Sequence, residues 1–586
     1  MNEPEREQPQ TENAESLSDP TLERESVEVE SSSPPEKRAS VARSAGIVSI
    51  AVMFSRVLGL IRETIFARFF GAGFLYDAFV VAFKVPNILR DLFAEGALSA
   101  AFVKVFTDYQ IKKSEIEAWQ LASLVFNVLA VVMSVITLIG ILIAPYVVPL
   151  LARGFSPEKA QLTVTLTQIM FPFILLVALA ALAMGVLNTK GKFGVPASAS
   201  TAFNICSIIF GLGCAYFLSG GSWEMSLDKR TIPSDAAQWA ITGMAIGTLI
   251  GGAAQLGIQI PSLLKVGFRF SPVLNFADEG VRRVMRLMGP AIIGTSAVQV
   301  KVLVDLVVVS GIEAGNSWLS YSFRLMQFPI GVFGVAIGTA AIPALSRLAS
   351  QDKTGEFRET LADALKLVFL LTIPAACGLV VLGEPIIGMI YQGGRFTQFD
   401  TNMTSWALAA YSIGLAGYAA IKVLSPSFYA LDDARTPMWI SIASIAVHAP
   451  MSYGMMTLLS GVGVSPERPN GYGHVGVALA TSTVALVNFC ALLFLMRRRI
   501  GRINGRSIAV ALGKIVIASA VMSTVAYLAY WLLAVYLDET LFWSRLIEAL
   551  VPVGFAILAF LAMAKLLRIS ELEKLHSSLR RKLASK

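Results

Sequence analysis

The chain contains long uninterrupted apolar stretches, and these restrict its fold more than any other feature. Many of them reach about 20 residues, the length that a helix needs to cross a hydrocarbon core roughly 30 Å thick. Inside such a core, only α-helices and closed β-barrels satisfy every backbone hydrogen-bonding group. The stretches are continuous and do not alternate between apolar and polar residues, which favours helices. The sequence therefore predicts an all-α polytopic membrane protein.

Composition agrees with this class and argues against others. Only 15% of the 586 residues are charged, 55% are hydrophobic, and the mean hydropathy is +0.65. Soluble domains usually carry about 25% charged residues. The net charge of +8 does not indicate nucleic acid binding, because basic residues in a membrane protein first set its topology. The four cysteines and three histidines lack metal-ligand spacing, so we expect no metal and no other cofactor.

Fourteen apolar segments follow one another along the chain, and we predict that each is a transmembrane helix. They begin near residues 43, 75, 118, 163, 195, 238, 283, 317, 360, 403, 436, 473, 507 and 542. Residues 1–42 are polar and acidic, and we expect a disordered cytoplasmic tail there. After it we expect a six-helix lobe over 43–278, a second six-helix lobe over 279–500, and two extra helices with a basic cytoplasmic C-terminus over 501–586.

Loop charge predicts the orientation of these spans. With a cytoplasmic N-terminus, the inner loops hold 19 lysines and arginines and the outer loops hold 8. The inner residues are Lys104, Lys112, Lys113, Lys190, Lys192, Lys265, Arg269, Arg282, Arg283, Arg286, Arg347, Lys353, Arg358, Arg435, Arg497, Arg498, Arg499, Arg502 and Arg506. The outer ones are Arg68, Arg153, Lys159, Lys229, Arg230, Arg395, Arg468 and Arg545. This excess follows the positive-inside rule and, with an even number of spans, places both termini in the cytoplasm.

A weak internal repeat with a period near 240 residues relates the two lobes. Residues 83–87 align with 323–327 and, one residue out of register, residues 194–196 align with 435–437. The second pair opens two helices after inner loops, each with a proline in the first turn, and Thr436 can cap the later one. Chance explains any single alignment, but the shared offset favours a repeat. Parallel halves of this kind enclose a cavity between them.

Charged and polar residues inside the spans are the candidate functional residues. A central charge costs about 2.5–3.5 kcal/mol on insertion scales, so each needs a water-filled cavity or a partner. Span-end arginines can snorkel, and neighbouring residues of opposite charge can form structural pairs; anion binding is the alternative. The residues concerned are Arg56, Arg62, Glu63, Asp77, Lys84, Asn87, Arg90, Asp91, Glu95 and Arg324.

Arg324 is the strongest candidate for anion binding. No acidic residue is close to it in sequence, and the repeat places it opposite Lys84. An arginine without a partner suits phosphate, because the planar guanidinium matches two phosphate oxygens. Arg56 and Arg62 point to different sides of a straight helix, and a bend at Gly59 would bring both toward one cavity.

Two further acidic sites allow more than one interpretation. Lys301 and Asp305 are four residues apart and share a helix face, as either a self-contained ion pair or an ion-coupling site. Asp432 and Asp433 resemble half a metal motif, but turn chemistry before Pro437 explains them better. The sequence has no Walker A motif, so we expect transport driven by the membrane potential or an ion gradient.

These motifs resemble those of the MurJ (MviN) family of lipid II flippases. The similarity runs through residues 55–59, 62–63, 71–73, 77–79, 82–87, 90, 93–99, 323–326, 328–329 and 331–339. It implies a transporter and not an enzyme, which moves lipid II, the undecaprenyl-pyrophosphate-linked peptidoglycan precursor, from the inner to the outer leaflet of the bacterial cytoplasmic membrane by alternating access. Its role would lie in cell-wall biogenesis and cell shape. The implied fold has two MATE-like lobes of the multidrug/oligosaccharidyl-lipid/polysaccharide exporter superfamily and a terminal helix pair.

The resemblance also implies roles for individual residues and partners. The cavity cations would be Arg56, Arg62, Arg90 and Arg324, and the supporting or gating residues would be Glu63, Asp77, Lys84, Asn87 and Glu95. Asp91 stands where many relatives have a second basic residue, which weakens the positive charge beside Arg90. Phe323 stands where some relatives have an acid, which leaves the pairing at the cytoplasmic gate open. The implied partners are lipid II, membrane lipids and the cell-wall synthesis machinery.

Other functions remain as alternatives. A flippase for another polyprenyl-pyrophosphate-linked oligosaccharide would recognise the same anion. A MATE-like cation or drug antiporter would favour membrane carboxylates over arginines. A membrane glycosyltransferase would need a carboxylate base and a sizeable outer loop, and a scaffold would not need several arginines in the bilayer.

Overall fold

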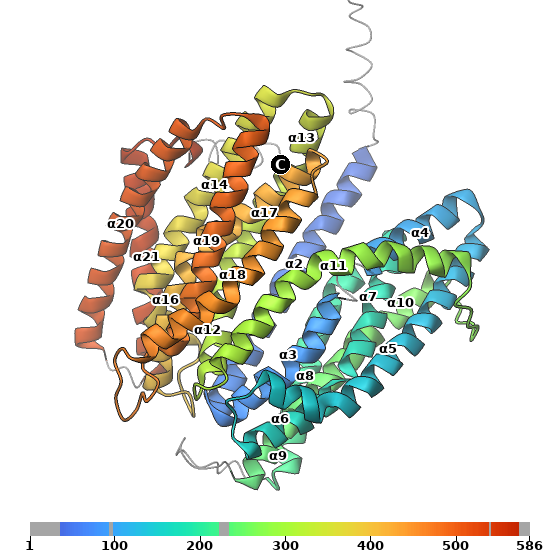
Figure 1. Cartoon of the computed structure of the whole chain (residues 1–586), viewed down its shortest axis with the longest axis horizontal. Helices are drawn as coiled ribbons and strands as arrows, with labels where there is room; N and C mark the ends of the chain where they lie inside the picture. Colours follow the sequence, from blue (N-terminus) through green and yellow to red (C-terminus); the bar gives the residue numbers. More distant parts are fainter. Residues whose placement is uncertain (1–34, 93–97, 222–233, 538–540, 573–586) are drawn as a thin grey trace, which may run out of the picture.

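The described residues form helices joined by loops (Figure 1). The computed structural model describes residues 35–572 apart from residues 93–97, 222–233 and 538–540. Within these ranges, the only β-pairing consists of isolated bridges, between Gly393 and Phe396 and between Ser465 and Arg468. The predicted all-α class is therefore confirmed. Most of the acidic tail lies outside the described residues.

The first lobe occupies one side of the molecule in Figure 1. Its helices are α2 (Pro35–Phe70), α3 (Phe74–Arg90), α4 (Ser99–Lys112), α5 (Glu115–Leu151), α6 (Pro157–Met170), α7 (Phe173–Thr189), α8 (Gly194–Leu218), α9 (Asp235–Gly257) and α10 (Ile260–Lys265). The long helix α2 packs along α8, and α3 packs against α6.

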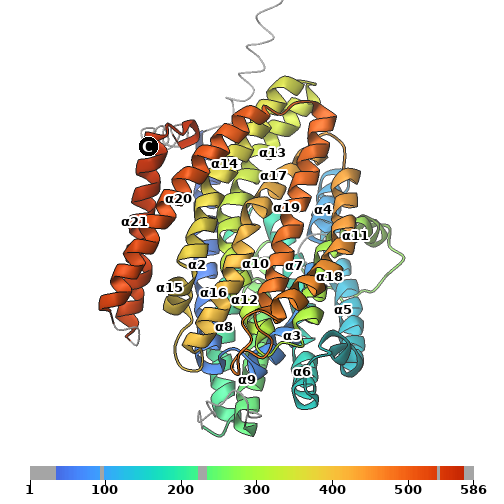
Figure 2. The same cartoon turned by 60° about the vertical axis from the view of Figure 1, so that its left-hand side comes forward.

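The second lobe and a terminal pair complete the bundle (Figures 1 and 2). The lobe comprises α11 (Glu279–Val309), α12 (Gly315–Pro329), the π-helical turn η2 (Ile330–Gly334), α13 (Val335–Ser350), α14 (Thr354–Val381), α15 (Gly383–Ile390), α16 (Gln398–Ile413), α17 (Leu415–Ala430), α18 (Arg435–Ser460) and α19 (Gly473–Ile500). Helix α11 contacts both lobes, through α4 and α5 on one side and α18 and α19 on the other. The terminal pair, α20 (Gly505–Tyr536) and α21 (Phe542–Leu566), packs on the flank against α14 and α15.

The number of membrane spans is only partly established. Ten of the described helical segments are long and apolar enough to cross a membrane, and the bent pair α16–α17 makes an eleventh. The predicted fourteen also include α2, α3 and α11. Helix α3 has 17 residues, and α2 and α11 carry several charged residues. The count of fourteen therefore stays a prediction.

The two lobes meet at the end of the bundle farthest from the first and last described residues. The first described residues of α2 and the last ones after α21 lie at the opposite end (Figures 1 and 2). Where the lobes meet, the Arg395 amide donates a hydrogen bond to the Arg68 carbonyl at 2.9 Å. The Gly154 amide donates to the Ser310 hydroxyl at 3.2 Å. We refer to this region as the joined end.

Local sequence explains how α8 and α18 begin. They start at Gly194 and Arg435, in agreement with the repeat. The predicted cap by Thr436 is wrong, because Asp433 accepts hydrogen bonds from the Thr436 amide at 3.0 Å and hydroxyl at 2.8 Å. Asp433 also pairs with Arg499 at 3.0 Å. Burial opposes ionisation, but the hydrogen bonds from Thr436 and the Arg499 charge together lower the pKa of Asp433. The turn interpretation of this acid is confirmed.

Small residues bring α8 and α9 into backbone contact. Gly243, Gly247 and Gly251 recur every four residues on α9, a small-xxx-small pattern of packed membrane helices. A Cβ on Gly247 would lie 2.2 Å from the Gly211 Cα, and one on Gly243 would lie 2.3 Å from the Ala215 nitrogen. Neither distance is compatible with a side chain. The glycines are therefore required for this packing.

We expect Gly247→Val to destabilise the first lobe, because the added side chain would separate two helices that touch. Overpacking of this kind costs about 1–3 kcal/mol. The matched control is Gly213→Val on α8, since a Cβ there meets no atom within 4 Å. Thermal unfolding of the detergent-solubilised protein, followed by size-exclusion chromatography, measures the difference. Equal melting temperatures for the two variants would contradict the packing argument.

Candidate functional site

Two adjoining cavities lie between the lobes. The larger, of about 280 Å³, is lined by residues of α3, α11, α12 and α16, and the smaller, of about 90 Å³, by residues of α2, α3, α9 and α12. Val80, Lys84, Ser320 and Arg324 line both. Asn87 lines the smaller one. We refer to the two together as the inter-lobe cavity.

Glu63 is the common partner of the residues around the smaller cavity. Its Oε1 lies 2.7 Å from Arg324 Nη1 and 3.2 Å from Arg62 Nη2, and its Oε2 accepts a 2.6 Å hydrogen bond from the Tyr76 hydroxyl. Arg62 is buried, with its guanidinium over the Phe203 ring, whereas 41% of the Arg324 side chain is exposed. Arg62 is thus fixed within the protein, and Arg324 is open to the cavity.

The prediction that Arg324 has no partner is therefore wrong. Its partner, Glu63, comes from α2 of the other lobe, far away in sequence. The charged residues that line the cavity are Arg62, Lys84, Arg324, Glu63 and Asp305, three cations against two carboxylates. The net charge of these five residues is +1, much smaller than the sequence suggests. Lys84 and Arg324 line the same space, in agreement with the repeat.

The other predicted arginines have different surroundings. The Arg56 side chain reaches η2 of the second lobe, because a Cβ on Gly331 would lie 2.7 Å from Arg56 Nη1. Arg90 Nη2 pairs with Asp91 Oδ1 at 2.7 Å, and Asp91 Oδ2 accepts from Gln299 at 3.1 Å. Asp91 therefore engages the Arg90 guanidinium in a structural pair, the alternative interpretation of this site.

Glu95 falls in residues 93–97 and lies outside the described residues. Its supporting role stays a prediction.

Asp77 connects the lobes at the joined end. It is completely buried, and its Oδ1 accepts from the Ser317 amide at 2.8 Å and hydroxyl at 2.5 Å. Its Oδ2 accepts from the Ala314 amide at 3.1 Å and pairs with Lys159 Nζ at 2.7 Å. Ser317 and Ala314 lie at the N-terminus of α12, where unpaired amides favour a carboxylate. This set, termed the Asp77 latch, holds α3 and α6 against α12.

We expect Asp77→Asn to weaken the joined end, because it leaves the buried ammonium of Lys159 without its counter-charge. Breaking a buried pair in this way typically costs about 3–5 kcal/mol. Spin labels at the exposed positions Glu158 and Glu467 report the separation of the lobes, which double electron–electron resonance measures. The distance distribution should broaden toward longer distances. Asp433→Asn, which breaks an ion pair within one lobe, is the control and should leave the distribution unchanged. An unchanged distribution in both variants would argue against the latch.

Asp305 belongs to a polar cluster of the second lobe. Its Oδ1 lies 2.8 Å from His448 Nε2 and accepts from the Ser452 hydroxyl at 3.1 Å. Its Oδ2 accepts from the Thr481 hydroxyl at 3.2 Å. No ion pair among the described residues joins it to Lys301, so the self-contained pair is wrong. The carboxylate instead connects α11 with α18 and α19 at the edge of the larger cavity.

Sequence reasoning missed the partners that distant spans supply. Ser444, His448 and Ser452 recur every four residues on α18, and that shared polar face could have marked them. Lys159 was assigned to an outer loop, whereas the structure buries it against Asp77. Within the described ranges, no group of three or more histidine, cysteine or acidic side chains is arranged to hold a metal ion.

Comparisons with known proteins match most of the chain. The family model described as lipid II flippase MurJ matches residues 66–546. A protein of Vibrio cholerae serotype O1, named probable lipid II flippase MurJ, is 35% identical over 460 residues, which cover 77% of this chain and 82% of that protein. The lipid II flippase MurJ of Burkholderia cenocepacia is 34% identical over 459 residues, covering 77% and 83%.

Solved structures agree with these matches. A lipid II flippase MurJ in an inward closed conformation is 29% identical, with a TM-score of 0.68 over 89% of this chain and 98% of that one. An inward-facing multidrug resistance MATE family transporter of the MOP superfamily has a TM-score of 0.61 at 12% identity, over 79% and 99% of the two chains, and shares the fold. The range matched by the family model contains Asp77, Lys84 and Arg324. The chain belongs to the lipid II flippase MurJ family.

Proposed function

We propose that this chain moves lipid II across the bacterial cytoplasmic membrane by alternating access, with the inter-lobe cavity as the binding site for its pyrophosphate. The observation that carries the proposal is the position of Arg324. The partly exposed Arg324 side chain lines both cavities beside Lys84 and forms an ion pair with Glu63. Arginine forms charge-assisted, bidentate hydrogen bonds with phosphate oxygens, which suits this headgroup.

Glu63 supports a mechanism of partner exchange. In this structure, its carboxylate pairs with Arg324 and also contacts Arg62 and Tyr76. A phosphate oxygen that reaches Arg324 competes with Glu63 for the same guanidinium. Glu63 then still has Arg62 and Tyr76, so no buried charge is left alone at any stage.

The orientation follows from loop charge. Both described chain ends lie at the same end of the bundle as the basic α13–α14 and α19–α20 connections (Figures 1 and 2), and the positive-inside rule assigns that end to the cytoplasm. The joined end then faces outward, so this conformation is closed to the outside by the Asp77 latch. Lipid II release requires that the latch opens. The predicted domain boundaries, near residues 42, 278 and 500, complete this proposal.

The remaining predicted residues take supporting roles. Arg56 reaches across to the second lobe at Gly331. Arg56 and Arg90 are therefore proposed as charges that attract the substrate toward the cavity, and Asn87 as a polar contact within it. Interaction with the cell-wall synthesis machinery stays a prediction from the family resemblance.

The cluster around Asp305 is the proposed coupling site for the driving ion. It combines a carboxylate with His448, Ser452 and Thr481 inside the membrane-spanning region, at the edge of the larger cavity. Ionisable groups at such positions commonly serve ion or proton transfer. A change in the charge of this cluster would act on Arg324 and Lys84 through the cavity that they share.

A flippase for another polyprenyl-pyrophosphate-linked oligosaccharide is the second candidate, since Arg324 and Lys84 would recognise the same pyrophosphate. The names of the relatives favour lipid II. A cation antiporter of the MATE type is less well supported, because the cavity carboxylate Glu63 is engaged by two arginines.

Substitution of Arg324 tests the proposed function. In cells that lack another flippase, we expect Arg324→Ala to abolish the appearance of lipid II in the outer leaflet of the cytoplasmic membrane. The variant protein should still accumulate to its normal level. Binding of lipid II to the purified protein should weaken about ten- to a hundredfold, the value of one charge-assisted contact of about 1.5–3 kcal/mol. Arg324→Lys should rescue only partly, because an ammonium lacks the bidentate fork.

The control for this experiment is Arg282→Ala, which removes an exposed arginine of α11 outside the cavity lining. Unchanged binding and flipping in Arg324→Ala would refute the cavity assignment. Equal affinity for a different polyprenyl-pyrophosphate-linked sugar would favour the second candidate.

Substitution of Asp305 tests the coupling role separately. In liposomes with an imposed ion or pH gradient, the wild type should flip lipid II faster than without it. We expect Asp305→Asn to retain lipid II binding and to lose this acceleration, because the neutral amide of asparagine cannot take part in ion binding or proton transfer as a carboxylate can. Arg282→Gln is the control, because this exposed arginine lies outside both the cluster and the cavity lining. Full acceleration in Asp305→Asn would exclude the cluster as the coupling site.

A further inference from the structure

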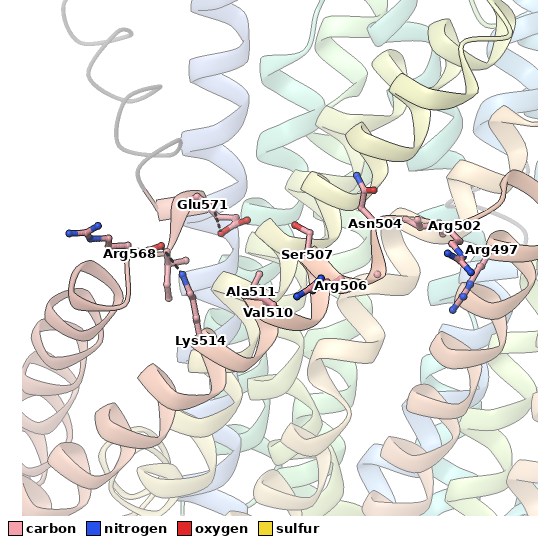
Figure 3. Close-up of a pocket in the computed structure, with 14 residues that line it drawn as sticks. Arg497, Arg502, Asn504, Arg506, Ser507, Val510, Ala511, Lys514, Arg568 and Glu571 are labelled. Carbon is pink, nitrogen blue, oxygen red and sulfur yellow. Dashed lines mark hydrogen bonds between the residues drawn. The ribbon is translucent and has the colours of Figure 1, made fainter.

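A basic pocket lies at the end of the bundle opposite the joined end. It has a volume of about 830 Å³ and is formed where α19 ends, α20 begins and α21 ends (Figure 3). The basic residues that line it are Arg497, Arg502, Arg506, Lys514 and Arg568. They come from three separate segments of the chain, so the pocket is not simply one charged loop.

The charges of this pocket are mostly unbalanced. Within the described part of the chain, no carboxylate pairs with Arg497, Arg502 or Arg506, and all three side chains are exposed. Lys514 Nζ donates to the Arg568 carbonyl at 3.3 Å, while the Arg568 side chain extends away from Lys514 (Figure 3). The carbonyl oxygen satisfies one donor of the ammonium and leaves its charge uncompensated.

The one acid in the pocket is already engaged. Glu571 is buried, lies 3.8 Å from Lys366 Nζ and accepts a hydrogen bond from the Ser570 hydroxyl at 3.1 Å. It shares this lysine of α14, which lies outside the pocket lining, with Asp363, 3.2 Å from the same Nζ. An anion that enters the pocket meets five cationic side chains and one acid.

The backbone of the pocket is held in an uncommon conformation at two places. Asn504 at the start of α20 has φ 23° and Arg568 after α21 has φ 49°, both in the left-handed region that non-glycine residues rarely adopt. Strained residues of this kind persist where the surrounding structure requires them, often at binding sites.

The pocket also borders on the lipid-facing surface. Helix α20 has 32 residues and is therefore about 48 Å long at 1.5 Å per residue, longer than the roughly 30 Å hydrocarbon core. Its first turns carry Arg506 and Lys514, and these charges place them at headgroup level. Val510, which lines the pocket, is 54% exposed, and Leu566 at the end of α21 is 73% exposed. A ligand in the pocket can thus keep acyl chains in the membrane.

We propose that this pocket binds the headgroup of an anionic phospholipid from the adjacent leaflet. Arg502 and Arg506 contact the phosphate, Lys514 lies deeper along α20, and the acyl chains follow the apolar surface of the terminal pair. The leaflet is the cytoplasmic one if the orientation proposed from loop charge is correct. Binding itself does not depend on that orientation or on lipid II transport. The bound lipid would fix the terminal pair to the second lobe, because α19, α20 and α21 all line the pocket.

Native mass spectrometry of the purified full-length chain in detergent tests this proposal, because it measures the binding of phosphatidylglycerol directly. The variant is Arg502→Ala with Arg506→Ala, which removes two exposed side chains that form no ion pair among the described residues. The matched control is Arg498→Ala with Lys565→Ala, which removes two exposed cations at the same end but outside the lining. Cations near an anionic lipid contribute roughly fivefold each, so the variant should bind about 25-fold more weakly and the control should bind normally.

Several results would overturn the proposal. Equal losses in variant and control would indicate unspecific surface charge, and equal binding of phosphatidylcholine would exclude recognition of an anion. Displacement by soluble glycerophosphoglycerol as effective as by the lipid would show that acyl chains make no contribution. The acidic residues 1–36 are a competing occupant, with eleven acids, two bases and therefore a net charge of −9. Lipid binding that appears only after their deletion would assign the pocket to the tail instead.

Lipid II binding, measured in parallel, separates this site from the inter-lobe cavity. Arg502→Ala with Arg506→Ala should leave the affinity for lipid II unchanged, and Arg324→Ala should leave the affinity for phosphatidylglycerol unchanged. Loss of both affinities in either variant would indicate one shared site and contradict the proposal.

Discussion

The buried carboxylate of Glu63 is the interaction on which the arrangement of the two lobes depends. A lone charge in a membrane interior is costly, so Arg62, Glu63 and Arg324 are tolerated only as a set. Because Arg62 and Glu63 belong to α2 while Arg324 belongs to α12, satisfying these charges requires that the lobes approach each other. Tyr76 adds a third helix, α3, to the same carboxylate. One anion thereby sets the positions of three helices around the cavity.

Two neighbouring residues of α3, Tyr76 and Asp77, connect the inter-lobe cavity to the joined end. Tyr76 donates to Glu63 and stacks on Tyr321 with ring centroids 4.6 Å apart, while its neighbour Asp77 forms the latch with α12. Tyr321 in turn donates to the Gly71 carbonyl at 3.2 Å. The same turn of α3 therefore contacts both the network of Arg62, Glu63 and Arg324 and the Asp77 latch at the joined end. Movement of Glu63 toward or away from Arg324 changes the contacts of Tyr76, and so bears directly on the turn that holds the latch.

The sequence predicted the helices better than it predicted the partners of their charged residues. Apolar runs of about 20 residues are a local signal, and they identified the helical class and most helix positions. The repeat placed Lys84 with Arg324 because two related helices carry them. The Glu63–Arg324 pair, by contrast, crosses the two lobes, and its geometry depends on tertiary packing that no local pattern encodes. Asp305 was assigned to Lys301 for the same reason, since helical spacing suggests neighbours on one helix but cannot reveal His448 on another.

The modest net charge of the cavity is better suited to transport than the arginine-rich cavity that the sequence suggests. A transported anion must bind strongly enough to enter and weakly enough to leave, as in other membrane pathways. Each charge-assisted contact contributes about 1.5–3 kcal/mol, so three free cations would together retain a pyrophosphate very tightly. In the proposed mechanism, Glu63 lowers this affinity, because it competes with the phosphate for Arg324 and is paired with Arg62. When the phosphate leaves, Glu63 reclaims the guanidinium, so release does not expose an unpaired charge to the membrane interior. A carboxylate beside the binding arginines thus makes the site reversible.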